Sequence, residues 1–202
     1  MMRILIVSDA WLPQINGVVR TLQAVTAELA VEGHSVTLIS PEQFASIPCP
    51  TYPEIRLALA TAGSVGRRIE EARPDAVHIA TEGPLGLAAR RWCIRHRRRF
   101  TTAYHTQFPE YLARRTGFPS AWFWPAIRRF HAPASAVLVS TLSVERQLNA
   151  HGIGRARRWS RGVDLSCFHP GVAPYQALAA LPRPILLYVG RVAVEKNIEA
   201  FL

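Results

Sequence analysis

The chain has little cysteine, almost no lysine and no long apolar run. Its three cysteines, Cys49, Cys93 and Cys167, lie far apart and form no CxxC pair. This spacing argues against a disulfide framework or a zinc site and favours isolated thiols in a reducing compartment. No run approaches the roughly 18–20 apolar residues that a membrane-spanning helix requires. Residues 4–7 are too few for the apolar part of a signal peptide, so we expect a cytoplasmic protein.

Acidic residues are outnumbered, and the formal charge of +10 comes almost wholly from arginine, because Lys196 is the single lysine. Arginine forms fixed hydrogen-bonding forks that suit phosphate and carboxylate groups. Nucleic acid, anionic lipid and phosphorylated small molecules are therefore all candidate partners. The chain has no nucleic-acid recognition motif, which argues against a specific nucleic-acid partner. A genomic preference for arginine explains the same composition without any functional content.

Short apolar runs alternate with helical patterns along most of the chain, which is typical of a doubly wound α/β protein. We therefore predict a Rossmann-like parallel sheet with right-handed crossovers and a ligand site at the carboxyl ends of its strands. The proline-containing stretch 41–53 is interpreted as a loop. The predicted strands span residues 3–8, 35–40, 75–80, 100–104, 135–140 and 156–160.

The chain is predicted to hold one domain and the start of another. Residues 1–170 form the first Rossmann-like domain, and the proline-containing stretch 171–184 is a linker. Residues 185–202 then supply a strand at 185–189 and a helix from 194 onward, the beginning of a second, truncated Rossmann-like domain.

Two predicted strand ends carry residues that fit a ligand site. Gly17 opens a helix after the first strand, where a phosphate can approach bare backbone N–H groups. A plain turn glycine behind an Asn16 helix cap gives the same pattern. His105 follows the strand at 100–104, where its ring would face the ligand crevice. A single histidine in such a place is more often structural, so both interpretations stay open.

Three further features are basic. Arg191 follows the predicted strand 185–189, with Lys196 five residues on, and two cations near one strand end suit a diphosphate. A solvated turn is the alternative. Six arginines within residues 90–99 end a helix, where cations suit the helix dipole. Residues 121–129 combine aromatic side chains with arginines, a pattern that fits either a membrane-surface helix or core packing.

Four motifs together resemble one family. They are the loop 9–18, the segment His-Thr-Gln-Phe-Pro-Glu-Tyr at 105–111, Arg-Gly-Val-Asp at 161–164, and Gly-Arg at 190–191 with Glu-Lys-Asn at 195–197. In this order the chain resembles glycosyltransferase family 4, especially the GDP-mannose-dependent alpha-mannosyltransferases and related enzymes that make glycolipids and sulfolipid. Each motif is weak alone, but the ordered set covers residues 1–202.

The resemblance implies a GT-B enzyme, in which two Rossmann-like domains face a cleft. Such an enzyme would transfer a hexose, with GDP-mannose as the expected nucleotide sugar, to a lipid or sugar acceptor. It would retain the anomeric configuration and need no metal or other cofactor, because positive groups neutralise the leaving diphosphate. The resemblance makes His105 catalytic. It makes Gly17, Arg191 and Lys196 donor-binding residues, and places Asn16 and Thr106 toward the acceptor.

The chain departs from the family in two ways. Arg161 stands where the family usually has asparagine, and the family's paired-glutamate segment would lie beyond Leu202. We therefore expect these 202 residues alone to transfer sugar very poorly. Two alternatives remain: a non-catalytic remnant that at most binds an acceptor, and a glycosyltransferase that uses a UDP-sugar. The arginines and Trp122 further suggest contact with an anionic inner-membrane surface.

Overall fold

A computed structural model describes residues 1–49, 52–173, 175–190, 192 and 197–201. The chain divides into two compact units, residues 1–160 and 161–202. The sequence instead predicts a boundary at a linker spanning residues 171–184, and that boundary stays a prediction.

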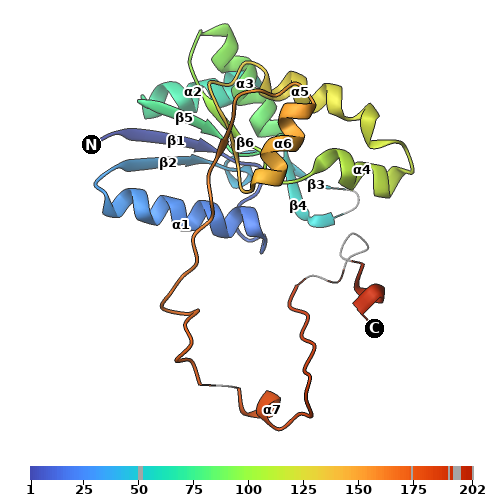
Figure 1. The fold of residues 1–202 in the computed structure, drawn as a ribbon. Coiled ribbons are helices and arrows are strands. Elements are labelled where there is room, and N and C mark those ends of the chain that lie inside the picture. The colour runs from blue at the N-terminus through green and yellow to red at the C-terminus, as the bar shows by residue number, and fades with distance from the viewer. Residues whose placement is uncertain (50–51, 174, 191, 193–196, 202) are drawn as a thin grey trace. The chain divides into compact units, whose positions relative to one another are not determined.

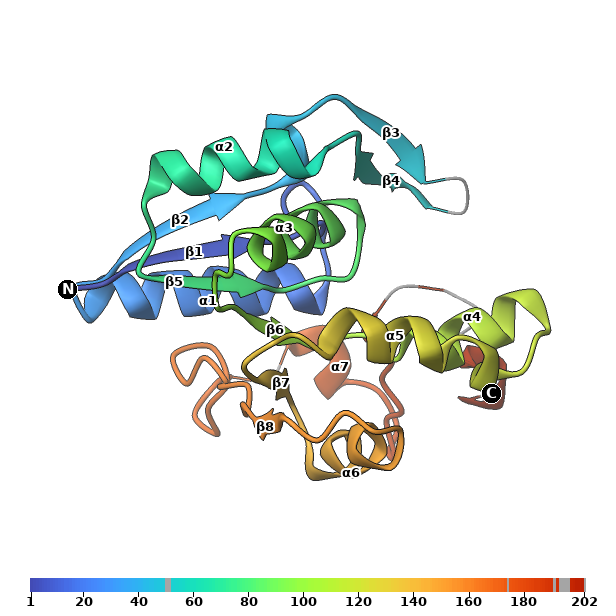
Figure 2. The same ribbon diagram turned by 90° about the horizontal axis from the view of Figure 1, so that it is seen from above.

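The first unit is built on a parallel sheet of six strands in the order β2-β1-β5-β6-β7-β8. Helix α1 covers one face of this sheet, and α2 and α3 lie on the opposite face (Figures 1 and 2). This arrangement confirms the predicted Rossmann-like fold. The strands are β1 Arg3–Val7, β2 Ser35–Ile39, β5 Ala76–Ile79, β6 Thr101–Ala103, β7 Val137–Val139 and β8 Ala156–Arg158. The helices are α1 Gly17–Val31, α2 Ala62–Ala72, α3 Pro84–Arg95, α4 Phe108–Thr116, α5 Trp124–His131 and α6 Leu142–Ala150, with short 3-10 helices at Pro41–Gln43 and Ser120–Trp122.

The central strand β1 is apolar on both faces because both are covered. Leu5 and Val7 belong to the main core cluster, which also includes buried residues of α2 and α3. Ile6 points the other way and packs with Leu22 of α1 and Ala80. Successive side chains of β1 thus pack into two cores on opposite faces of the sheet, which explains the continuous apolar run in the sequence.

Local sequence signals set several helix boundaries. Thr141 accepts a hydrogen bond from Val144 N at 3.3 Å and caps the start of α6. Pro84 occupies the first turn of α3, where its missing N–H has no helical partner to lose. Gly152, just after α6, has a φ of +79°, the left-handed conformation that glycine adopts readily.

The predicted loop 41–53 is wrong in part. It contains β3 (Ser46–Cys49), which pairs in antiparallel fashion with β4 (Tyr52–Ala58) in a separate two-stranded sheet. Proline is tolerated on a two-stranded ribbon because each strand has an unpaired edge, so Pro48 does not exclude a strand.

The predicted strand at 185–189 is also wrong, since these residues form no strand. The described part of the second unit contains no strand that could pair with them, and an apolar run without a partner does not become a strand. That unit has a short helix α7, Gln176–Ala179, and a 3-10 helix, Ile198–Phe201. The predicted helix from 194 lies partly outside the described residues, and its described part is that 3-10 helix.

Candidate active site

The site is positioned by the reversal of strand order at β1. The chain passes from β1 outward to β2 and then returns across the sheet to β5, so β1 and β5 are neighbours with opposite onward connections. Open α/β sheets bind ligands at such a switch point, at the carboxyl ends of the strands. The loops that leave β1, β5 and β6 at this edge carry residues 8–16, 80–83 and 104–107.

The loop after β1 ends in a well-formed helix cap. Asn16 is extended, and its Oδ1 accepts hydrogen bonds from Val18 N and Val19 N, both at 3.0 Å. Helix α1 therefore begins at Gly17, at the carboxyl edge of the sheet. Capping occupies the acceptor oxygen of Asn16, which is the structural role that the sequence left open. The contact of Asn16 with an acceptor substrate and that of Gly17 with the donor stay predictions.

Asp9, at the start of the same loop, is almost fully buried. Its carboxylate accepts hydrogen bonds from Leu85 N at 2.8 Å, Gly86 N at 3.2 Å and the Thr81 hydroxyl at 2.8 Å. Burial raises the pKa of Asp9, and these hydrogen bonds oppose the rise. The carboxylate thus ties the loop after β1 to the first turn of α3, which follows β5.

His105 follows β6 and lies in an aromatic cluster. Its ring centroid is 5.9 Å from that of Trp159, and the ring of His78 lies 6.1 Å from the same indole. Burial, and secondly His105 nearby, lower the pKa of His78 to about 4. His78 is therefore neutral at pH 7 and adds no positive charge beside His105. Thr106 lies in the turn that leads to α4, where its carbonyl accepts a hydrogen bond from Phe108 N at 2.8 Å.

A buried polar cluster behind β6 was not foreseen from the sequence. His131 Nε2 lies 3.4 Å from Glu82 Oε1, and Thr102 Oγ1 lies 2.8 Å from His131 Nδ1. The facing pair, Glu82 Oε1 and His131 Nε2, makes no hydrogen bond to any residue that the structure describes. Burial raises the pKa of Glu82, and the nearby His131 opposes this rise.

Burial also raises the pKa of Tyr104, and the negative charges of Glu110 and Glu82 raise it further. Glu82 follows β5, so the strand-end rule that selected His105 would have found it too.

The predicted diphosphate-binding pair cannot be placed. Arg191 and Lys196 both lie outside the described residues. Of the predicted site residues, the structure therefore brings two pairs to one edge of the first unit's sheet: Asn16 and Gly17 after β1, and His105 and Thr106 after β6. Within the described part of the chain, no cluster of three or more metal-ligating side chains is found.

The two basic segments differ in their environments. Arg90 donates hydrogen bonds to the carbonyls of Phe130 (2.8 Å) and Arg129 (2.6 Å) near the end of α5. Its side chain therefore joins α3 to α5, which is a structural role. In the aromatic segment, Trp124 is buried, whereas Trp122 is 66% exposed and stacks on Phe118 at 5.2 Å. One tryptophan thus packs in the core and the other faces solvent. Among the described helices, none is long and apolar enough to span a bilayer.

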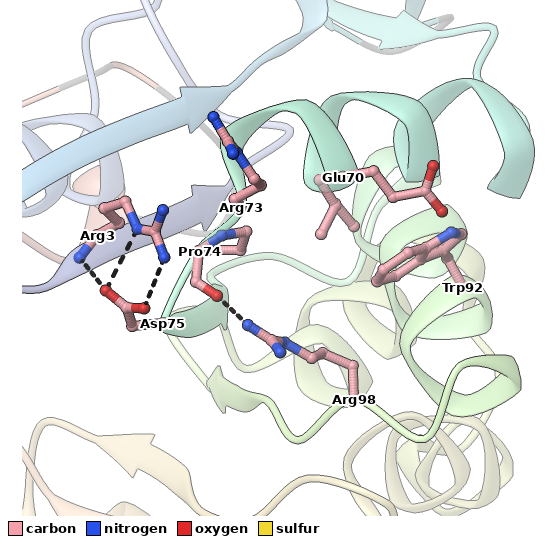
Figure 3. A pocket seen from close by; sticks show the side chains of 8 residues that line it. Arg3, Glu70, Arg73, Pro74, Asp75, Trp92 and Arg98 are labelled. Atoms are coloured by element: carbon pink, nitrogen blue, oxygen red, sulfur yellow. Dashed lines mark hydrogen bonds and ion pairs between the residues drawn. The ribbon is translucent and has the colours of Figure 1, made fainter.

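A pocket at the opposite edge of the sheet is lined by residues that make structural contacts with one another (Figure 3). Arg3 Nη2 lies 3.0 Å from Asp75 Oδ1, which joins the amino ends of β1 and β5. Arg98 donates a hydrogen bond to the Pro74 carbonyl. This pocket lies away from the carboxyl ends of the strands, so it is not the ligand crevice that the fold predicts.

Sequence comparison relates the chain to known proteins. The family profile described as Glycosyltransferase Family 4 matches residues 15–166. The chain is 30% identical, over 98% of its length, to a GDP-mannose-dependent alpha-mannosyltransferase of Mycolicibacterium smegmatis, of which it covers 58%. It is also 30% identical, over 76% of its length, to the sulfoquinovosyl transferase SQD2 of Arabidopsis thaliana, of which it covers 32%.

The fold is similar to a solved structure as well. Anabaena HepE, crystallised in complex with UDP-glucose, superposes with a TM-score of 0.53 at 14% identity, over 84% of this chain and 47% of HepE. The chain therefore spans a little over half the length, 58%, of the mannosyltransferase from Mycolicibacterium smegmatis.

Proposed function

The chain belongs to glycosyltransferase family 4, and from this premise we propose that the protein containing it transfers a hexose from a nucleotide sugar to a lipid or sugar acceptor. GDP-mannose is the donor that we propose first, because mannosyltransferases that use it are among the similar proteins. The observation that carries the proposal is the position of Gly17 and His105, which follow two strands that end at the same edge of one parallel sheet.

The proposed chemistry divides the work among groups of different charge. His105 hydrogen-bonds the donor sugar, and the first turn of α1 directs the Gly17 N–H toward the donor phosphate. Arg191 and Lys196 bind the diphosphate and stabilise it as it leaves. Because these cations and the helix end neutralise the leaving group, the reaction needs no metal. The sugar keeps its anomeric configuration.

The acceptor side of the proposal includes the inner membrane surface. Exposed Trp122, stacked on Phe118, lies next to α5, whose residues Arg128 and Arg129 are exposed. An aromatic pair beside cations suits the boundary between lipid headgroups and acyl chains. Trp122→Ser should weaken binding to vesicles that contain phosphatidylglycerol, whereas Val31→Ser, at a still more exposed apolar site on α1, should not. Equal binding by both variants would remove the membrane contact from the proposal.

The test of the proposed reaction uses the protein purified from its native cell. It is incubated with GDP-mannose or a UDP-hexose, cell lipids and EDTA, and the products are identified by mass and anomeric configuration. We expect α-linked hexose transfer from GDP-mannose that EDTA does not abolish and that Lys196→Ala does. Transfer from the UDP-hexose alone would favour the alternative donor. Absence of transfer from either donor would favour the non-catalytic remnant, whose remaining property is acceptor binding.

A further inference from the structure

A continuous chain of hydrogen bonds joins the first turn of α3 to the first turn of α1. It begins where the Asp9 carboxylate accepts from Leu85 N (2.8 Å) and Gly86 N (3.2 Å). The N-cap position of α3 is Gly83, which has no side chain with which to cap the helix. Asp9, from another loop, therefore satisfies helix N–H groups that would otherwise lack partners.

The series of hydrogen bonds continues through the loop after β1. Gln14 Nε2 donates to the Asp9 carbonyl at 3.3 Å, and Asn16 Nδ2 donates to Gln14 Oε1 at 3.2 Å. Asn16 Oδ1 then caps α1 by accepting from Val18 N and Val19 N. Asp9 and Gln14 are each only 8% exposed, so water competes little for these bonds. We call this series of residues, Asp9, Gln14 and Asn16, the capping chain.

Two residues near the Asp9 carboxylate are glycines, and a Cβ would not fit at either position. A Cβ on Gly83 would collide with the Asp9 carboxylate, and a Cβ on Gly86 would collide with the Thr81 carbonyl oxygen. Thr81 also donates its hydroxyl to Asp9 and accepts from Asp9 N at 2.7 Å. The carboxylate is therefore held on several sides, and its position is closely fixed.

The capping chain links the two loops that flank the β1–β5 switch point, where a ligand is expected. We propose that Asp9 and Gln14 are positioning residues, which fix the first turn of α1 and so set the direction of the Gly17 N–H. The coupling between the two helix ends stands on geometry alone. Its use at the donor phosphate rests on the proposed function.

Amide hydrogen exchange tests the coupling in this chain. In Gln14→Met, which keeps the side-chain volume but loses both polar atoms, we expect exchange at Val18 and Val19 to quicken about fivefold, the effect of losing one hydrogen bond of ordinary net strength. Leu85 and Gly86 should quicken by a similar factor. The Gln14 side chain hydrogen-bonds to Asp9 and Asn16 and to none of these four amides, so unchanged exchange at all four, in a folded variant, would overturn the proposal.

A second pair of variants separates coupling from general destabilisation. Asp9→Asn should quicken exchange at the first turn of α1 as well as α3. Asp75→Asn also removes a carboxylate that accepts from a backbone N–H, that of Arg3 at 2.7 Å, but at the other edge of the sheet. It should leave the first turn of α1 unchanged. Equal effects of the two variants on α1 would mean that Asp9 acts through stability alone.

Turnover then tests the use of the coupling. The Gln14→Met variant is made in the protein from its native cell. It should lower kcat for hexose transfer about tenfold or more, with little change in KM for the nucleotide sugar. The reason is that a misdirected Gly17 N–H stabilises the transition state less well. An exchange effect with unchanged kcat would keep the coupling and overturn its role at the donor. Absence of transfer in the unsubstituted protein would instead count against the proposed function.

Discussion

Acidification should destabilise the first unit through His78, a partly buried histidine beside His105. The ring binds Thr101 Oγ1 at 2.8 Å, and its Nε2 is buried. Burial first, and then His105, lower the pKa of His78 from 6.5 to about 4. The unfolded chain therefore takes up a proton below about pH 6.5, while the folded chain resists until about pH 4. Stability is unaffected above this window and falls as the pH drops through it.

The size of the effect follows from the width of the window. Each pH unit within it costs about 1.4 kcal/mol. Between about pH 6.5 and pH 5 this amounts to a loss of roughly 2 kcal/mol, which is a large fraction of the stability of an ordinary domain. His78→Gln removes the titrating ring and keeps polar atoms near Thr101, so this variant should lose about 2 kcal/mol less than the unsubstituted chain does.

Urea unfolding at about pH 7.5 and about pH 5 measures this difference. Gly154→Ala serves as the control, because it adds a methyl group in open space and changes no titrating group. The control should lose as much stability on acidification as the unsubstituted chain. If His78→Gln does so as well, or if the His78 ring titrates near its ordinary value in an NMR experiment, the argument from burial is refuted.

Two further expectations concern packing and burial. Gly86→Ala should lower the free energy of unfolding by about 2–3 kcal/mol, because the added Cβ meets the Thr81 carbonyl; Gly154→Ala, with open space at its Cβ, should change it little in urea unfolding. Burial raises the pKa of Cys93 to about 12, so iodoacetamide at about pH 8 should label exposed Cys167 in the folded chain and Cys93 only after unfolding, as read by mass spectrometry.

The sequence was sufficient to predict the fold of the first unit because its signals are local. Apolar runs such as that of β1 are continuous because both faces are buried, and Thr141 and Pro84 mark helix starts by their own chemistry. The strand-end rule also directed attention to Gly17 and His105, since parallel strands end at one edge.

What the sequence did not reveal depends on contacts between distant residues. Asp9 caps a helix that begins some 75 positions later in the chain, and no local pattern announces a cap that comes from another loop. The partner of Glu82, His131, is similarly remote. The apolar run 185–189 shows the reverse: it has the composition of a strand, but the described part of its unit offers no strand to pair with.

The central claim is that the carboxyl edge of this sheet carries out hexose transfer, and His105→Ala tests it most directly. In the protein from its native cell, this variant should lower kcat/KM for transfer from GDP-mannose by about 10²–10³-fold, the usual effect of removing one group that stabilises the transition state. His34→Ala, at the other edge of the sheet, should leave the rate unchanged. A His105→Ala variant that folds and keeps the rate within a few-fold would contradict the account.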